Sequence, residues 1–125
     1  MEVKKEVKKP LLLEHLGDHP TLRIISFLLE NRLIDFSKKQ IAEGAQISKV
    51  TLFKHWKKLE SAGIVKVTRR FGKTKLHKLD IDNQIVKKLI DLDLALKTRI
   101  MQKQTEMKIE SKEQNEERYR EMAYV

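Results

Sequence analysis

Few side chains in this sequence are arranged for catalysis or for metal binding. The chain has no cysteine, which excludes thiolate catalysis, disulfides and cysteine metal sites. The four histidines are scattered and belong to no carboxylate-rich metal-binding spacing. The four glycines stand alone and form no phosphate-binding loop. We therefore predict no enzyme, no catalytic residue, no metal ligand and no cofactor.

Positive charge is concentrated in the middle third of the chain. Residues 38–78 contain twelve Lys or Arg and two Asp or Glu, a net charge of +10. Residues 1–37 and 79–125 carry net charges of 0 and −1, so the middle supplies the whole excess of the chain's +9. Such a block favours a polyanionic partner, most often nucleic acid. Charge alone leaves open a solvated surface without a partner.

The only tryptophan lies within this basic block, in a segment with helical periodicity. Ser48 is expected to cap a helix that runs to about residue 62, with Gly63 at its C′ position. Helical spacing places three apolar side chains on one stripe: Leu52, Trp56 and Leu59. The opposite face consists of Val50, Lys54, Lys57 and Ser61, flanked by Thr51 and Lys58. We predict that one face anchors the helix in a core and the other meets a partner.

Two helices are expected before this segment. The first spans about 19–31, with Asp18 as N-cap and Pro20 in its first turn. Residues 33–36 are short and apolar and could form one strand. The second spans about 38–45 and begins with a capping box between Ser37 and Gln40. The four leucines of residues 11–16 must dock on a core to leave water.

A β-hairpin and a long helix are expected after it. Alternation from Val65 onward predicts two strands joined by a turn at residues 71–73. Asp82 is expected to cap the long helix, which runs to about residue 102. Beyond 102 the sequence is polar, and both a helical extension and disorder stay open.

This order of elements resembles a known family. The segment SKKQIAEGAQISKVTLFKHWKKLESAGIVKVTRRFGKTKLHKLD, residues 37–80, is similar to the winged helix-turn-helix domain of prokaryotic transcriptional regulators, in the MarR-like and ArsR-like style. The chain also looks like small archaeal, plasmid or viral regulators. It departs from the pattern at two positions. Gln46 stands where the turn usually has Gly or Asn, and Gly44 is unusual inside a helix.

The resemblance implies double-stranded DNA as partner, with helix 48–62 in the major groove and wing 69–75 on the adjacent minor groove or backbone. The DNA-binding residues it implies are Lys38, Lys39, Ser48, Lys49, Val50, Thr51, Lys54, Lys57, Lys58, Arg69, Arg70, Lys73 and Lys75. A DNA-binding protein with a job in plasmid partition, replication or DNA coating is the alternative. A winged domain that binds only protein is a further one.

The long helix carries two apolar rows, which indicates two contact surfaces. One row would face its own domain and the other a second copy, so we predict a homodimer; a monomer with residues 11–16 on the second row is the alternative. The predicted interface comprises Ile85, Val86, Leu89, Ile90, Leu92, Leu94, Leu96, Ile100 and Met101.

The predicted fold is mainly α with a small β-hairpin wing (α+β). Its parts are an N-terminal extension (1–18), a winged helix domain (19–81), a dimerisation helix (82–102) and a polar C-terminal segment (103–125). No apolar run is long enough to span a bilayer, and we expect no signal peptide. The expected location is the cytoplasm, in association with the nucleoid.

Overall fold

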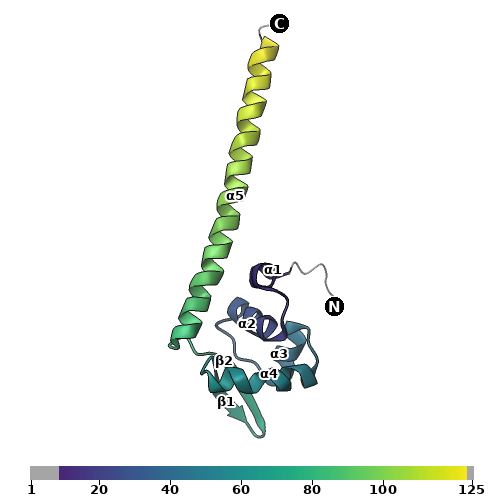
Figure 1. The fold of residues 1–125 in the computed structure, drawn as a ribbon, viewed down its shortest axis with the longest axis vertical. Coiled ribbons are helices and arrows are strands. Elements are labelled where there is room, and N and C mark those ends of the chain that lie inside the picture. Colours follow the sequence, from purple (N-terminus) through teal and green to yellow (C-terminus); the bar gives the residue numbers. More distant parts are fainter. Residues whose placement is uncertain (1–8, 124–125) are drawn as a thin grey trace. The chain divides into compact units, whose positions relative to one another are not determined.

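The computed structural model describes residues 9–123 (Figure 1). They divide into two compact units, and the first ends at Asp93 and the second begins at Leu94. The elements are, in chain order, α1 (Leu11–Leu16), α2 (Pro20–Glu30), α3 (Lys38–Ala45), α4 (Lys49–Ser61), β1 (Val65–Phe71), β2 (Thr74–Leu79) and α5 (Gln84–Ala123). The fold is therefore mainly helical with one two-stranded hairpin, as the sequence predicts. None of the described helices is long and apolar enough to cross a membrane.

Helix α2 begins one residue later than predicted, because its cap is His19 and not Asp18. The His19 Nδ1 accepts the Thr21 amide at 3.1 Å. The Asp18 carboxylate instead accepts two hydrogen bonds from the Arg23 guanidinium, at 2.6 and 2.8 Å. These bonds are the main reason that the pKa of Asp18 falls to about 2. The prediction that Asp18 caps α2 is wrong because a guanidinium five residues away binds this carboxylate.

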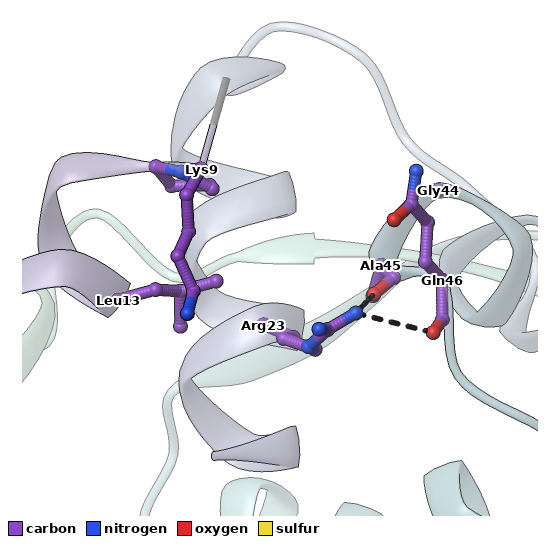
Figure 2. Close-up of a pocket in the computed structure, with 7 residues that line it drawn as sticks. Lys9, Leu13, Arg23, Gly44, Ala45 and Gln46 are labelled. Atoms are coloured by element: carbon purple, nitrogen blue, oxygen red, sulfur yellow. Dashed lines mark hydrogen bonds between the residues drawn. The ribbon is translucent and has the colours of Figure 1, made fainter. Parts of the chain in front are cut away.

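The turn between α3 and α4 has a left-handed backbone at Gln46, the position where the family pattern usually has Gly or Asn. Gln46 has a φ of 58°, in the left-handed region. The guanidinium of Arg23 donates to the carbonyls of Ala45 and Gln46, at 3.4 and 3.3 Å (Figure 2). It thereby satisfies two carbonyls at the end of α3. Gly44 is explained by its neighbour in α2: a Cβ at this position would overlap the ring of Phe27, so only glycine lets the two helices approach.

The capping box at the start of α3 is confirmed. The Ser37 hydroxyl accepts the Gln40 amide at 3.2 Å, and the Gln40 side chain accepts the Ser37 amide at 2.9 Å. The strand predicted at residues 33–36 reduces to one antiparallel bridge, in which Phe36 and His77 exchange backbone hydrogen bonds of 2.8 and 2.7 Å. This bridge attaches the linker between α2 and α3 to strand β2.

The hairpin has antiparallel strands joined at Gly72 and Lys73, and Gly72 takes a left-handed φ of 58°. The register shifts between Val67 and Arg69, which leaves Thr68 as a bulge. A bulge bends its strand and redirects the side chains beyond it. Here the residues beyond it are the basic side chains of the wing.

Helix α5 is continuous from Gln84 to Ala123, so the segment beyond residue 102 is a helical extension. Its cap is Asn83, whose Oδ1 accepts the amides of Ile85 and Val86 at 2.7 and 3.3 Å. The prediction that Asp82 caps the helix is wrong, because the side chain of Asn83 takes the first free amides of α5; Asp82 lies in the turn just before, where its own amide donates to the Asp80 side chain. Asn83 also donates to the carbonyls at the end of α4, those of Ala62 and Gly63.

Candidate nucleic-acid interface

Helix α4 has one buried face and one exposed face, as predicted. Trp56 is 2% exposed, and Leu52 and Leu59 are equally buried in the core. On the opposite face Val50 is 78% exposed, and the lysines of α4 are also exposed: Lys49, Lys54, Lys57 and Lys58. The apolar stripe therefore fixes the rotation of the helix and holds its basic face toward solvent.

The N-terminus of α4 is organised by two hydroxyl groups. Ser48 accepts the Thr51 amide at 3.1 Å and donates to the Thr51 hydroxyl at 2.9 Å. The predicted cap is confirmed. Because the Ser48 proton is engaged within the protein, the Thr51 hydroxyl keeps its own proton for a further acceptor.

Two lysines open α3 in different environments. Lys39 is exposed, whereas Lys38 is half-buried against aromatic rings. The Nζ of Lys38 lies 5.4 Å from the ring centroid of Phe53 and 5.6 Å from that of Trp56, which is within the range of cation–π interactions. Lys38 therefore lies beside α4, where Phe53 itself is 56% exposed.

The wing contains a contact that the sequence does not reveal. The guanidinium of Arg69 donates to both carboxylate oxygens of Asp35, at 2.7 and 2.9 Å. Thr68, in the bulge, donates to the same carboxylate at 2.5 Å. The hydrogen bonds from Arg69, and after them the bond from Thr68, hold the pKa of Asp35 well below its usual range. Arg69 is thus oriented by the linker between α2 and α3, although its side chain stays 60% exposed.

The remaining wing cations are exposed and lie on the hairpin. Arg70 faces Lys75 across the strands, and Lys73 stands in the turn. Within residues 9–123, these three side chains and the lysines of α4 form no ion pair with an acidic group. Their charges are therefore available to an anionic partner.

Among the described residues, no three His, Asp or Glu side chains gather in a group that could hold a metal ion. His15 and His19 are four positions apart, but Gly17 separates α1 from α2, so they do not share a helix face. His55 lies edge-on to His19, with ring centroids 5.2 Å apart. Two residues with clear positioning contacts, Asp35 and Asn83, were not predicted. The partner of Asp35 lies 34 positions away, and Asn83 stands beside Asp82, a second residue with a high capping propensity.

Comparisons with known proteins give similarity in fold only. No protein-family model and no curated protein sequence matches the chain. The solved structure of NadR with 4-hydroxyphenylacetate has a TM-score of 0.53, with 21% identity over 75% of this chain and 67% of its own. MepR, a transcription regulator of the Staphylococcus aureus multidrug efflux pump MepA, has a TM-score of 0.57, with 14% identity over 77% of this chain and 69% of its own.

A third structure carries a family name. ZitR of Lactococcus lactis, a zinc-responsive MarR family member, has a TM-score of 0.50, with 18% identity over 68% of this chain and 58% of its own. The chain has the winged helix-turn-helix fold. In this fold α3 and α4 form the helix-turn-helix and the hairpin forms the wing, which is the arrangement that residues 37–80 predict.

Downstream of the winged helix-turn-helix, the predicted dimer residues differ in exposure. Val86 is fully buried within the first unit, so it belongs to the core of its own chain. Four others are exposed: Ile85, Leu92, Leu94 and Met101. The rest are half-buried: Leu89, Ile90, Leu96 and Ile100. The interface itself stays a prediction.

Proposed function

We propose that the chain is a homodimeric transcriptional regulator that binds double-stranded DNA sequence-specifically, in the cytoplasm and in association with the nucleoid. Recognition helix 48–62 enters the major groove, and wing 69–75 lies on the adjacent minor groove or backbone. The observation that carries this proposal is the rotation of α4. Because Trp56 anchors one face in the core, the opposite face presents exposed lysines that have no acidic partner within residues 9–123.

Base contacts are assigned to the side chains nearest the start of α4. Val50 and Thr51 offer methyl groups to thymine methyls, and Lys54 offers its ammonium to guanine acceptors. Lys49 lies at the first position of the helix and completes this group. Lys57 and Lys58 lie further along the helix and, with Ser48, Lys38 and Lys39, are assigned to phosphates.

The wing is assigned two kinds of role. Arg70 is the arginine proposed to enter a narrow minor groove, where negative potential is concentrated. Arg69, held by Asp35, fixes the angle of the hairpin and adds charge near the backbone. Lys73 and Lys75 contact phosphates on either side. The two arginines are assigned different roles because Arg69 pairs with Asp35, whereas Arg70 has no acidic partner among residues 9–123.

The dimer is proposed to form through α5. Its exposed apolar side chains would lose contact with water when a second copy covers them. A two-fold dimer presents two recognition helices to half-sites about one turn of DNA apart. The DNA site would then be a palindrome.

One observation favours a second candidate function, a non-regulatory role in plasmid partition, replication or DNA coating. Helix α4 contains no Arg, Asn or Gln, the side chains that make bidentate contacts to bases. Binding with little sequence preference would then rest on phosphates and DNA shape. A winged domain that binds only protein is less favoured, because such a domain has no use for a basic α4 and wing.

Selection from random duplex DNA with the purified full-length chain tests the proposed function. We expect a palindromic consensus, and a mass in solution that corresponds to two chains. Binding without any consensus would favour the coating or partition role. Absence of DNA binding at low salt would overturn both DNA-binding functions.

A further inference from the structure

A hollow of about 340 Å³ lies between the start of α3 and the wing strand β2. Its lining combines two segments that are far apart in the sequence. The residues are Ser37, Lys38, Lys73, Thr74, Lys75 and His77. Three of these six side chains are lysines, and two carry hydroxyl groups that can donate hydrogen bonds. No acidic side chain belongs to this lining.

The helix end at this hollow adds partial positive charge. Helix α3 has eight residues, and its capping box uses the amides of Ser37 and Gln40. The amides of Lys38 and Lys39 lie in the first turn, where the helix itself provides no acceptor. Helix N-termini favour anions for this reason. Lys38 is also held in place, because its ammonium lies over the rings of Phe53 and Trp56.

His77 provides an independent observation that points to a ligand. The residue lines the hollow although it is only 2% exposed. Its ring lies edge-on to Trp56, with centroids 4.9 Å apart. Its Nδ1 is buried and has no hydrogen-bond partner among the residues that the structure describes. A buried polar atom without a partner is costly, so it marks a place where a further group can bind.

We propose that this hollow, lined by Lys38, Lys73, Lys75 and His77, is a binding site for a phosphate group. A phosphate offers several oxygen acceptors and about two negative charges when free, or one within a DNA backbone. Lysine ammonium groups bind such an anion as point charges. The hydroxyls of Ser37 and Thr74 add neutral donors, and a protonated His77 ring adds another.

The surroundings of His77 fit this role. Burial lowers the pKa of the His77 imidazole, and the nearby charges of Lys38 and Lys75 lower it further. The carbonyl of Phe36 and the carboxylate of Glu60 act in the opposite direction. A bound phosphate would offset the lysine charges and raise the pKa of His77. The ring of His77 therefore reports occupancy of the site directly.

The phosphate has two possible sources, a free phosphate or the DNA backbone. In the second case the inference rests on the proposed function and specifies one backbone contact of the DNA interface. It would place one DNA strand between α3 and the wing. In the first case the site would bind free phosphate whether or not DNA binds. The chemistry of the site is the same in both cases.

The first experiment follows the histidine rings of the full-length chain by NMR during titration with inorganic phosphate. Sodium chloride at equal ionic strength is the control for screening. We expect saturable shifts of the His77 ring signals and a higher pKa for His77, whereas His19 and His55 outside the hollow stay unchanged. The double variant Lys38→Gln, Lys75→Gln should lower phosphate affinity at least about tenfold. Lys88→Gln, an exposed position of α5, is the matched control.

The second experiment uses duplex DNA in place of phosphate. If the backbone is the source, DNA shifts the His77 ring, and a neutral methylphosphonate at one position of the strand removes the shift. A shift with phosphate but not with DNA identifies a site for free phosphate. If His77 responds to neither probe, or responds equally to chloride, the proposal is overturned. Because DNA affinity is measured in the same titration, an unresponsive His77 in a bound complex contradicts this site alone and leaves the proposed function standing.

Discussion

Helix α4 and the wing carry the same kind of positive charge but hold it in different ways. In α4 the cations stand on a helix whose opposite face is locked by Trp56, Leu52 and Leu59. In the wing a two-stranded hairpin is buried at its base, at Val65, His77 and Leu79, and a salt bridge from Arg69 to Asp35 ties its outer part to the linker before α3. The orientation of α4 thus comes from apolar packing, whereas the wing combines a buried base with polar contacts to the linker, namely the Phe36–His77 bridge and the Arg69–Asp35 pair.

This difference has consequences for the roles of individual residues. The lysines of α4 are oriented by the helix and stay available to a partner. Of the two arginines in the wing, one supports the hairpin and only Arg70 is without an acidic partner in the described chain. Similar side chains in one basic block therefore differ in function. Four predictions, from the largest expected effect to the smallest, test this comparison.

The largest effect is expected from loss of the α4 anchor. Trp56→Ala should lower the free energy of unfolding by about 3–5 kcal/mol, because it removes a large buried aromatic side chain. Phe53→Ala, on the same helix but 56% exposed, is the matched control and should cost less than about 1 kcal/mol. Urea unfolding followed by circular dichroism measures both. Equal losses would mean that α4 is not anchored through Trp56.

The next effect concerns base recognition. Lys54→Ala should weaken binding to the selected duplex by about 1–3 kcal/mol more than binding to random duplex, because a base contact is lost. Lys88→Ala in α5 should change neither affinity. Fluorescence titrations with both duplexes provide the comparison. Equal losses of binding free energy on the two duplexes would mean that Lys54 contacts phosphate and not a base.

The two arginines of the wing should differ in role: Arg70 should affect the salt dependence of DNA binding, and the contact of Arg69 with Asp35 should affect the dynamics of the hairpin. Arg70→Ala should lower DNA affinity and reduce the salt slope by about one unit, because one phosphate-region contact is lost. Asp35→Asn keeps every cation but weakens the attachment of Arg69, so it should speed amide exchange in β1 and β2. The exchange rates in α4 should stay unchanged. A slope unaffected by Arg70→Ala would remove this residue from the interface.

The smallest effect is a pH dependence of stability. The pKa of His77 is lowered in the folded chain, first by burial, so the unfolded chain binds more protons at mildly acidic pH. The contribution of His77 to the free energy of unfolding is fully present above about pH 6.5, the ordinary pKa of histidine. This contribution decreases as the pH falls toward the lower pKa that His77 has in the folded state. Unfolding at pH 7.5 and at pH 5.5 should show the loss, and His77→Gln should reduce it, leaving the part that comes from the lowered pKa of His55. Higher stability at pH 5.5 would contradict the sign.

Local patterns predicted much of this molecule. The capping box at Ser37, the cap at Ser48 and the glycine at position 63 are short-range features that the structure confirms. The rotation of α4 also followed from its own periodicity, because a helix with one apolar stripe has one way to face a core. The resemblance of residues 37–80 to winged helix-turn-helix domains agrees with the fold.

Contacts between distant segments were the part that the sequence did not reveal. Asp35 and Arg69 are 34 positions apart, and no pattern in either segment indicates their pairing. The cap predicted at Asp18 failed because Arg23 binds its carboxylate, and the cap predicted at Asp82 failed because the next residue, Asn83, accepts the first amides of α5; His19 caps α2. Tertiary context decides between neighbouring polar residues that have similar capping propensity.

The central claim is that the exposed face of α4 reads a DNA sequence. Its most direct test is titration of the selected duplex and of a scrambled duplex with the full-length chain, at several salt concentrations. The proposed function predicts a preference of about a thousandfold for the selected duplex that persists as salt rises. Equal affinities for the two duplexes, with a steep salt dependence, would contradict sequence recognition and assign the chain to DNA coating or partition.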